Sequence, residues 1–363
     1  MEEKIYDLIR KAEQLRERSV YREALQYFKK ALLLSRKHHH LDGIIDATLA
    51  SADIYRITGN FDLAIKNYEE ALESCEALGN SLTAADCMVG IGLSLRAIGM
   101  WKESLKFIET AKKTYRKVND KKGLAFSLWA EAGAQRVAGN ITVAINGFKE
   151  AKRMFTALSF NSGIAYALCG LGGTHRIAGK YKESLDYYRR ANALFASLKD
   201  TFGSAYSHCG IGNAYRMLGN YREAMNHFRK ATRLYESIGD LVSYSYTLWS
   251  VAMVHKMNGD FARARRAVGK AMRNFRKTKD PRGIIYCDMA LGEMLLLEGK
   301  KRAAEKKLRT ASANADRHRF RLEQCHATVL LSALTSGRGS LNERCYKKIG
   351  IHLPDISLPF NIP

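Results

Sequence analysis

The chain has 363 residues, and its 59 lysines and arginines exceed its 36 aspartates and glutamates, which gives a formal net charge of +23. This length allows two or three globular domains or one elongated array. The sequence has no run of about 18 apolar residues, which excludes a membrane-spanning helix, and its charged, amphipathic start lacks the apolar core of a signal peptide. The seven scattered cysteines argue against a disulfide framework and predict a reducing, cytoplasmic compartment.

A glycine that is suited to end a helix recurs every 40 residues. The positions are Gly59, Gly99, Gly139, Gly179, Gly219, Gly259 and Gly299. An alanine follows each of them by twelve residues, and a small residue precedes each by seven. Because no proline occurs in residues 1–280, we interpret each 40-residue unit as two antiparallel helices that cross at the small residues.

In chain order, the array begins with a helix pair over residues 5–37, in which Ser19 takes the place of the glycine. Further pairs follow up to residue 320, so residues 1–320 form the predicted array. The residues expected to cap the first helices are Asn80, Asp120, Asp200, Asp240 and Asp280. Residues 321–350 predict a degenerate capping pair with Gly339 in register.

Residues 351–363 leave the helical pattern. Apolar residues alternate along this tail at Ile356, Leu358, Phe360 and Ile362. This alternation predicts an extended segment that lies on an apolar surface.

The units resemble the tetratricopeptide repeat. That family's pattern is matched by Ile211-Gly212-x-x-Tyr215, Ala224-x-x-x-Phe228 and Ala231. The period of 40 rather than about 34 residues is similar to the long repeats of kinesin light chains, Pins-type polarity adaptors and bacterial Rap-type peptide receptors. The resemblance implies an all-α, right-handed α-solenoid of about eight repeats, whose first helices line a concave groove.

A cation precedes each of these glycines by three residues, except at the last one, where Leu296 stands. We call the series the cation ladder: Arg16, Arg56, Arg96, Arg136, Arg176, Arg216 and Lys256. Residues three, seven and ten before each cation share its helical face. In the middle repeats that face carries Trp129, Tyr166, Tyr206, Asn213, Tyr246 and Trp249. Gly133 and Gly173 also lie there, and since glycine costs about 1 kcal/mol in a helix, the close approach of a ligand backbone is one explanation.

Arg, Tyr and Trp dominate binding energy at interfaces, so these residues predict a partner site over residues 126–256. We take the ladder members from Arg96 to Lys256, together with the aromatic residues and Asn213, as its candidates. Asp46, Asp53 and Asp86 share the equivalent face near the start and would neutralise Arg56 and Arg96.

Packing alone offers another explanation of the same residues. A cation in the last turn of a helix is favoured by the helix dipole, and it could pair with an acid of a neighbouring repeat, such as Glu183 or Glu223. The tyrosines could form a second packing layer.

We expect a non-catalytic scaffold that holds an extended, acidic peptide segment of a partner protein in the groove. The alternative is binding of RNA or single-stranded nucleic acid through the same groove and through residues 256–321, where 19 cations exceed 7 acids. A basic stripe lies in this region at Arg266, Lys270, Arg273 and Lys277. A third hypothesis places the chain's own tail in the groove. No pattern predicts a catalytic site, a cofactor, a metal or a membrane partner, and self-association stays open.

Overall fold

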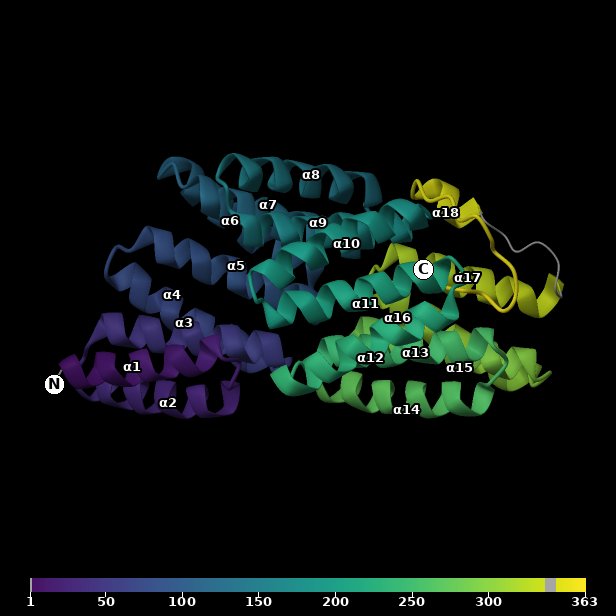
Figure 1. Ribbon diagram of the computed structural model, residues 1–363, viewed down its shortest axis with the longest axis horizontal. Coiled ribbons are helices and arrows are strands. Elements are labelled where there is room, and N and C mark those ends of the chain that lie inside the picture. Colours follow the sequence, from purple (N-terminus) through teal and green to yellow (C-terminus); the bar gives the residue numbers. More distant parts are fainter. Residues whose placement is uncertain (1, 337–343) are drawn as a thin grey trace. The chain divides into compact units, whose positions relative to one another are not determined.

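The computed structural model describes residues 2–336 and 344–363, which form eighteen helices and no strand (Figure 1). The helices are α1 (Glu2–Glu17), α2 (Tyr21–Lys37), α3 (Leu41–Thr58), α4 (Phe61–Ala77), α5 (Ser81–Ala97), α6 (Trp101–Lys117), α7 (Lys121–Val137), α8 (Ile141–Ala157), α9 (Asn161–Ile177), α10 (Tyr181–Ser197), α11 (Thr201–Met217), α12 (Tyr221–Ile238), α13 (Leu241–Met257), α14 (Phe261–Lys277), α15 (Pro281–Leu297), α16 (Lys301–Arg317), α17 (Arg321–Ser336) and α18 (Arg344–Lys348). The all-α, paired-helix solenoid predicted from the repeats is confirmed.

The helices divide into two compact units. Unit 1 consists of the described residues up to Glu131 together with Glu236–Asp240. Unit 2 consists of Ala132–Tyr235 together with the described residues from Leu241 onward.

The glycines that recur every 40 residues end their helices, as predicted. All seven have a positive φ, between 74° and 88°, and Ser19 takes the same left-handed conformation at φ 60°. The predicted caps Asn80, Asp120, Asp200 and Asp280 each accept a hydrogen bond from the backbone N–H three residues later. The helices of each 40-residue repeat therefore begin and end where the local backbone chemistry dictates.

Small residues let the two helices of a pair approach closely. A Cβ added at Gly212 would lie 2.6 Å from the ring of Phe228, and one at Gly292 would lie 2.7 Å from Leu308. The alanines of the same repeat, from Ala31 to Ala311, are fully buried. Larger side chains at these positions would force the pairs apart.

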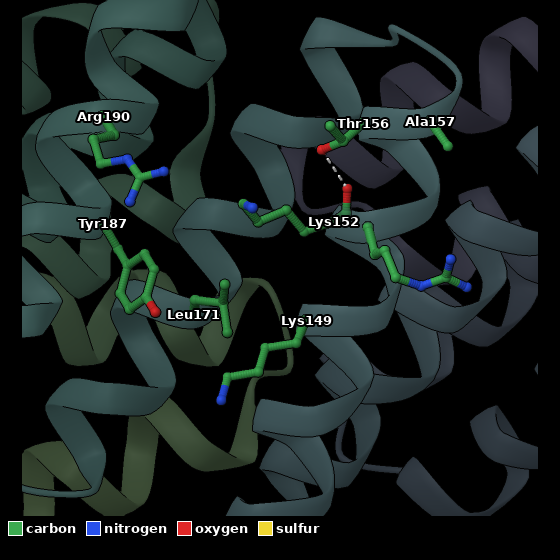
Figure 2. Close-up of a pocket in the computed structure, with 8 residues that line it drawn as sticks. Lys149, Lys152, Thr156, Ala157, Leu171, Tyr187 and Arg190 are labelled. Atoms are coloured by element: carbon green, nitrogen blue, oxygen red, sulfur yellow. Dashed lines mark hydrogen bonds between the residues drawn. The ribbon is translucent and has the colours of Figure 1, made fainter.

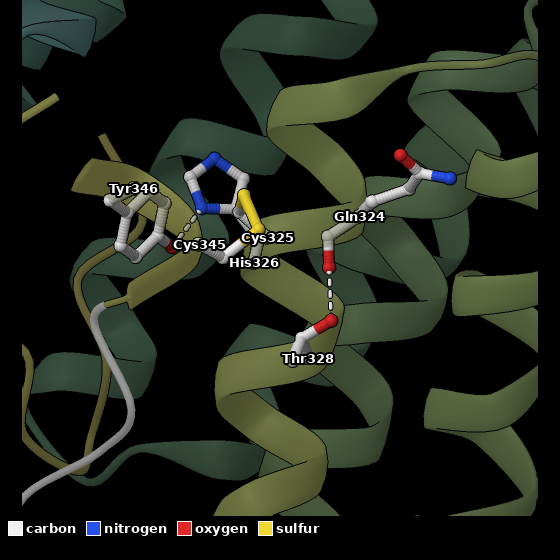
Figure 3. Close-up of a disulfide and its surroundings, with 6 residues drawn as sticks. All are labelled: Gln324, Cys325, His326, Thr328, Cys345 and Tyr346. Carbon is white, nitrogen blue, oxygen red and sulfur yellow. Dashed lines mark hydrogen bonds between the residues drawn. A yellow bond between two sulfur atoms is a disulfide. The ribbon is translucent and has the colours of Figure 1, made fainter. Parts of the chain in front are cut away.

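A disulfide joins Cys325 on α17 to Cys345 on α18 (Figure 3). This corrects the expectation drawn from the cysteine count, because the pair lies beyond the regular repeats and 20 residues apart, where no familiar spacing marks it. The other five cysteines are free. Gly339 lies outside the described residues, so its predicted register stays a prediction.

None of the helices in the described ranges is both long and apolar enough to cross a membrane.

Candidate functional site

In unit 1 the ladder cations have partners within the unit. Arg16 pairs with Glu13 at 2.7 Å, and Arg56 pairs with Asp53 at 3.1 Å. Burial alone would lower the pKa of Arg56, but its contacts with Tyr68 and Asp53 raise it above the ordinary value. The predicted neutralisation of Arg56 by an acid of the same face is therefore confirmed.

The remaining predicted residues of unit 1 are placed differently. Arg96 is half-buried on α5. Asp86 accepts a hydrogen bond from the Tyr115 hydroxyl at 2.6 Å. Trp129 stacks on Phe126, with ring centroids 5.5 Å apart. The role of Arg96 and Trp129 toward a partner stays a prediction.

In unit 2 the predicted tyrosines pack against phenylalanines. Tyr166 meets Phe195 at a centroid distance of 4.8 Å, and Tyr246 meets Phe275 at 4.7 Å. Tyr206 lies parallel to Phe202, with centroids 6.5 Å apart. Much of each ring is thus used for packing, as the second explanation above expects.

Gly173 makes room for protein side chains. A Cβ there would lie 2.8 Å from Arg136 Nη1 and 3.0 Å from the Tyr188 hydroxyl oxygen. Arg136 itself packs 5.8 Å from the centre of the Phe148 ring. Packing thus gives a reason for this glycine, and the approach of a ligand backbone stays a prediction.

The tail, residues 351–363, contacts Lys256 within unit 2. The Lys256 ammonium is fully buried and donates to the Phe360 carbonyl oxygen at 2.7 Å and to the Glu293 carboxylate. Glu293, also fully buried, accepts from the Phe360 backbone N–H. Burial lowers the pKa of Lys256, and Glu293 opposes that shift. A buried ion pair therefore holds the tail main chain at two points.

The tail also covers Arg216. This guanidinium is fully buried, and it donates to the Ile362 carbonyl oxygen at 2.9 Å and to the Asn361 side-chain oxygen. The Asn361 amide donates in return to the Arg216 carbonyl oxygen at 3.1 Å. Figure 1 shows the end of the chain beside α11, which carries Arg216. We call Arg216, Lys256 and Glu293 the tail-binding cluster.

Two predicted site residues orient Arg216 instead of reaching the tail. Asn213 accepts from Arg216 Nε at 3.2 Å. The Arg216 guanidinium lies 5.6 Å from the centre of the Trp249 ring, and Trp249 Nε1 donates to the Tyr286 carbonyl oxygen at 3.1 Å. Burial, followed by the nearby Arg176 charge, lowers the pKa of Arg216 to about 9. The cluster thus contains an arginine whose hydrogen bonds all go to neutral oxygens.

Arg176 occupies the preceding ladder position. Its Nε atom is buried and has no hydrogen-bond partner among the described residues. No ion pair between a ladder cation and Glu183 or Glu223 occurs in the described residues of unit 2, but Lys256 pairs with Glu293 of the next repeat, so pairing with an acid of a neighbouring repeat accounts for that ladder cation.

Glu293 was missed from the sequence, although a signal existed. It stands on α15 three residues before Leu296, on the face that carries Asn213 and Met253 in the two preceding repeats. An acid in the first repeat that lacks a ladder cation indicates a counter-charge for Lys256, the last cation of the ladder.

A basic pocket of about 580 Å³ between α8 and α10 was also missed (Figure 2). It is lined by four cations, Lys149, Lys152, Arg153 and Arg190, and also by Tyr187 and Leu171. Arg153 is engaged by Glu150 at 2.6 Å. The surplus of cations favours anions at this opening.

The four residues of the predicted basic stripe, Arg266, Lys270, Arg273 and Lys277 on α14, are all exposed, and Lys270 also reaches the Tyr244 hydroxyl at 2.5 Å. Elsewhere, no group of three or more His, Cys, Asp or Glu side chains within residues 2–336 and 344–363 is arranged to hold a metal.

Comparison with known proteins places the fold. The model of the tetratricopeptide repeat matches residues 43–117 and 163–237. No curated protein sequence matches the chain. A solved Rap protein complexed with Competence and Sporulation Factor is similar, with a TM-score of 0.60 and 13% identity over 92% of this chain and 98% of that one.

Two further solved structures are similar. The Rap conjugation gene regulator of plasmid pLS20 in complex with the Phr* peptide has a TM-score of 0.65 and 13% identity over 86% of this chain and 95% of that one. The APC/C hetero-tetramer Cut9–Hcn1 has a TM-score of 0.59 and 16% identity over 91% of this chain and 55% of that one. At these identities the likeness concerns the fold alone.

Proposed function

Because the chain is a tetratricopeptide-repeat protein, we propose that it is a non-catalytic scaffold that binds an extended peptide segment of a partner protein. The site is the face formed by the ladder positions of unit 2, at Arg136, Arg176, Arg216 and Lys256. The observation that carries the proposal is the tail, a non-helical segment whose main-chain carbonyls accept hydrogen bonds from two of these four cations.

The spacing of the ladder suits an extended peptide. Packed helices lie about 8–10 Å apart, and an extended chain rises about 3.3 Å per residue. About every third residue of a partner segment would therefore meet a new cation. Of the Rap structures named above, one is a complex with Competence and Sporulation Factor and the other a complex with the Phr* peptide, which agrees with the proposal without carrying it.

An acidic segment suits the ladder positions that the tail leaves open. Among these positions, Arg176 has a buried Nε that finds no hydrogen-bond partner in the described part of the chain. A carboxylate beside Arg176 would form a charge-assisted hydrogen bond, which is stronger than one between neutral groups.

The test is capture of partner proteins by an Arg136→Glu/Arg176→Glu variant. The matched control, Arg153→Glu/Arg190→Glu, makes the same change in charge at the basic pocket between α8 and α10. We expect the ladder variant to lose proteins that both the native chain and the control retain. Equal recovery by all three proteins would refute the peptide site.

Homopolymer RNA serves as the competitor in the same experiment. RNA that displaced the captured proteins, with affinity falling steeply as salt rises, would favour the nucleic-acid alternative and count against the peptide proposal.

A further inference from the structure

The tail contacts the tail-binding cluster through both its main chain and its side chains. We infer that Arg216, Lys256 and Glu293 form a peptide site that recognises an aromatic–Asn–aliphatic segment, with the chain's own Phe360–Ile362 as resident ligand. The inference rests on the proposed function, since it names the class of peptide segment that the ladder face accepts at Arg216 and Lys256.

The main-chain contacts fix the register of the segment. Lys256 donates to the carbonyl of Phe360, Glu293 accepts from its N–H, and Arg216 donates to the carbonyl of Ile362. These contacts involve a donor and an acceptor at one residue and an acceptor two residues later. Any peptide can supply these groups, so they position the segment without selecting its side chains.

The middle residue is selected by its amide. The Asn361 side chain accepts from the Arg216 guanidinium and donates to the Arg216 carbonyl oxygen. An aspartate has no N–H donor, so one of its carboxylate oxygens would face that carbonyl oxygen. This position therefore departs from the acidic preference expected along the rest of the ladder.

The flanking residues are selected by burial. Phe360 is 1% exposed and Ile362 is fully buried. The Phe360 ring approaches the His326 ring edge-on, with centroids 6.0 Å apart. An aromatic residue and an aliphatic residue thus fill two closed spaces on either side of the asparagine.

A resident segment competes with any partner. A tethered ligand acts at an effective concentration that reaches the millimolar range for short linkers. A free peptide of the same sequence should therefore bind the native chain poorly until the tail is loosened.

Gly179 offers a way to loosen the tail without altering the tail-binding cluster. A Cβ at Gly179 would lie 2.0 Å from the His352 carbonyl oxygen, so Gly179→Ala must move the tail. Gly219→Ala is the matched control, because its Cβ meets nothing within 4 Å and the two glycines have similar φ values of 83° and 77°. Phe360→Ala is a second full-length variant, and it removes the tail's aromatic anchor.

The probe is a dye-labelled peptide of residues 356–363, and its binding is measured by fluorescence anisotropy. We expect Gly179→Ala and Phe360→Ala to bind it at least tenfold more tightly than the native chain and Gly219→Ala. Replacement of the peptide's asparagine by aspartate, or of its phenylalanine by alanine, should weaken binding to both loosened variants at least tenfold. Circular dichroism establishes that each variant is folded.

Three results would overturn the inference: no binding to either folded loosened variant, equal binding to the Gly219→Ala control, or an aspartate peptide that binds as tightly as the asparagine peptide. If the peptide does not bind but the capture of partner proteins still depends on Arg136 and Arg176, only this inference is refuted. If the peptide binds but the capture of partner proteins does not depend on those two arginines, only the proposed function is refuted.

Discussion

The pair Lys256–Glu293 should make Glu293→Gln one of the most destabilising single substitutions in unit 2. Both side chains are 0% exposed, and Glu293 also accepts from the Phe360 N–H. Removing one partner of a buried pair leaves an uncompensated charge, at a cost of about 3–5 kcal/mol. The matched control is Glu305→Gln, which breaks an ion pair with Arg309 whose side chains are 71% and 45% exposed, and exposed pairs contribute about 0.2–1 kcal/mol.

The assay is urea denaturation followed by circular dichroism at neutral pH, with amide hydrogen exchange in α13 and α15 as a local measure, because repeat arrays do not always unfold in one step. Adding Lys256→Met to Glu293→Gln should recover part of the loss, since it removes the stranded charge. A Glu293→Gln cost no larger than that of Glu305→Gln would refute the assignment of Glu293 as the buried counter-charge. A double variant less stable than Glu293→Gln would do so as well.

Three further outcomes follow from single contacts. Burial lowers the pKa of His326 to about 3, whereas a histidine in the unfolded chain has a pKa of about 6.5. As the pH falls, the unfolded chain therefore takes up this proton before the folded one, and the free energy of unfolding should fall by about 2 kcal/mol from pH 7 to pH 5. His326→Gln should reduce that fall, as measured by the denaturation midpoints at the two pH values. The disulfide Cys325–Cys345 closes a loop of 20 residues, which stabilises the folded chain by about 3 kcal/mol. Its reduction should therefore speed proteolysis of the tail, followed over time by mass spectrometry, and an unchanged rate would contradict this. Desolvation raises the pKa of Asp86, and the hydrogen bond from the Tyr115 hydroxyl opposes that rise. Tyr115→Phe removes this donor, so unit 1 should lose about 1.5 kcal/mol, measured by the urea midpoint.

The sequence was sufficient for the repeats because their requirements are local. A glycine that must adopt positive φ, such as Gly219, and a cap such as Asp200 act on the residues beside them. Their period of 40 therefore appears in the sequence without any knowledge of tertiary contacts. The same is true of the buried alanines, because helix crossings repeat with the units.

The partners of the ladder were harder to predict, because they come from residues far apart in the chain. Arg216 and Ile362 are 146 residues apart, and Lys256 and Phe360 are 104 residues apart. The alternation of the tail predicted its burial, and Phe360 and Ile362 are indeed buried. Which cations they meet depends on the path of the tail, on which periodicity carries no information. The roles of Arg136 and Arg176 toward a partner stay predictions.

One position explains why the same cation series behaves differently along the chain. It lies three residues before each ladder position, one helical turn away on the same face. In unit 1 it holds Glu13 and Asp53, which pair with Arg16 and Arg56, but Leu93 before Arg96. In unit 2 it holds Gly133, Gly173, Asn213 and Met253, so these ladder cations have no acid one turn before them. The acid returns only as Glu293, in the repeat whose ladder position is a leucine. The position thus lacks an acid from Leu93 to Met253. Within this stretch Arg216 and Lys256 donate to carbonyl oxygens of the tail instead, so part of the acid-free ladder already meets a peptide main chain, and this is what supports a ligand for that part of the ladder.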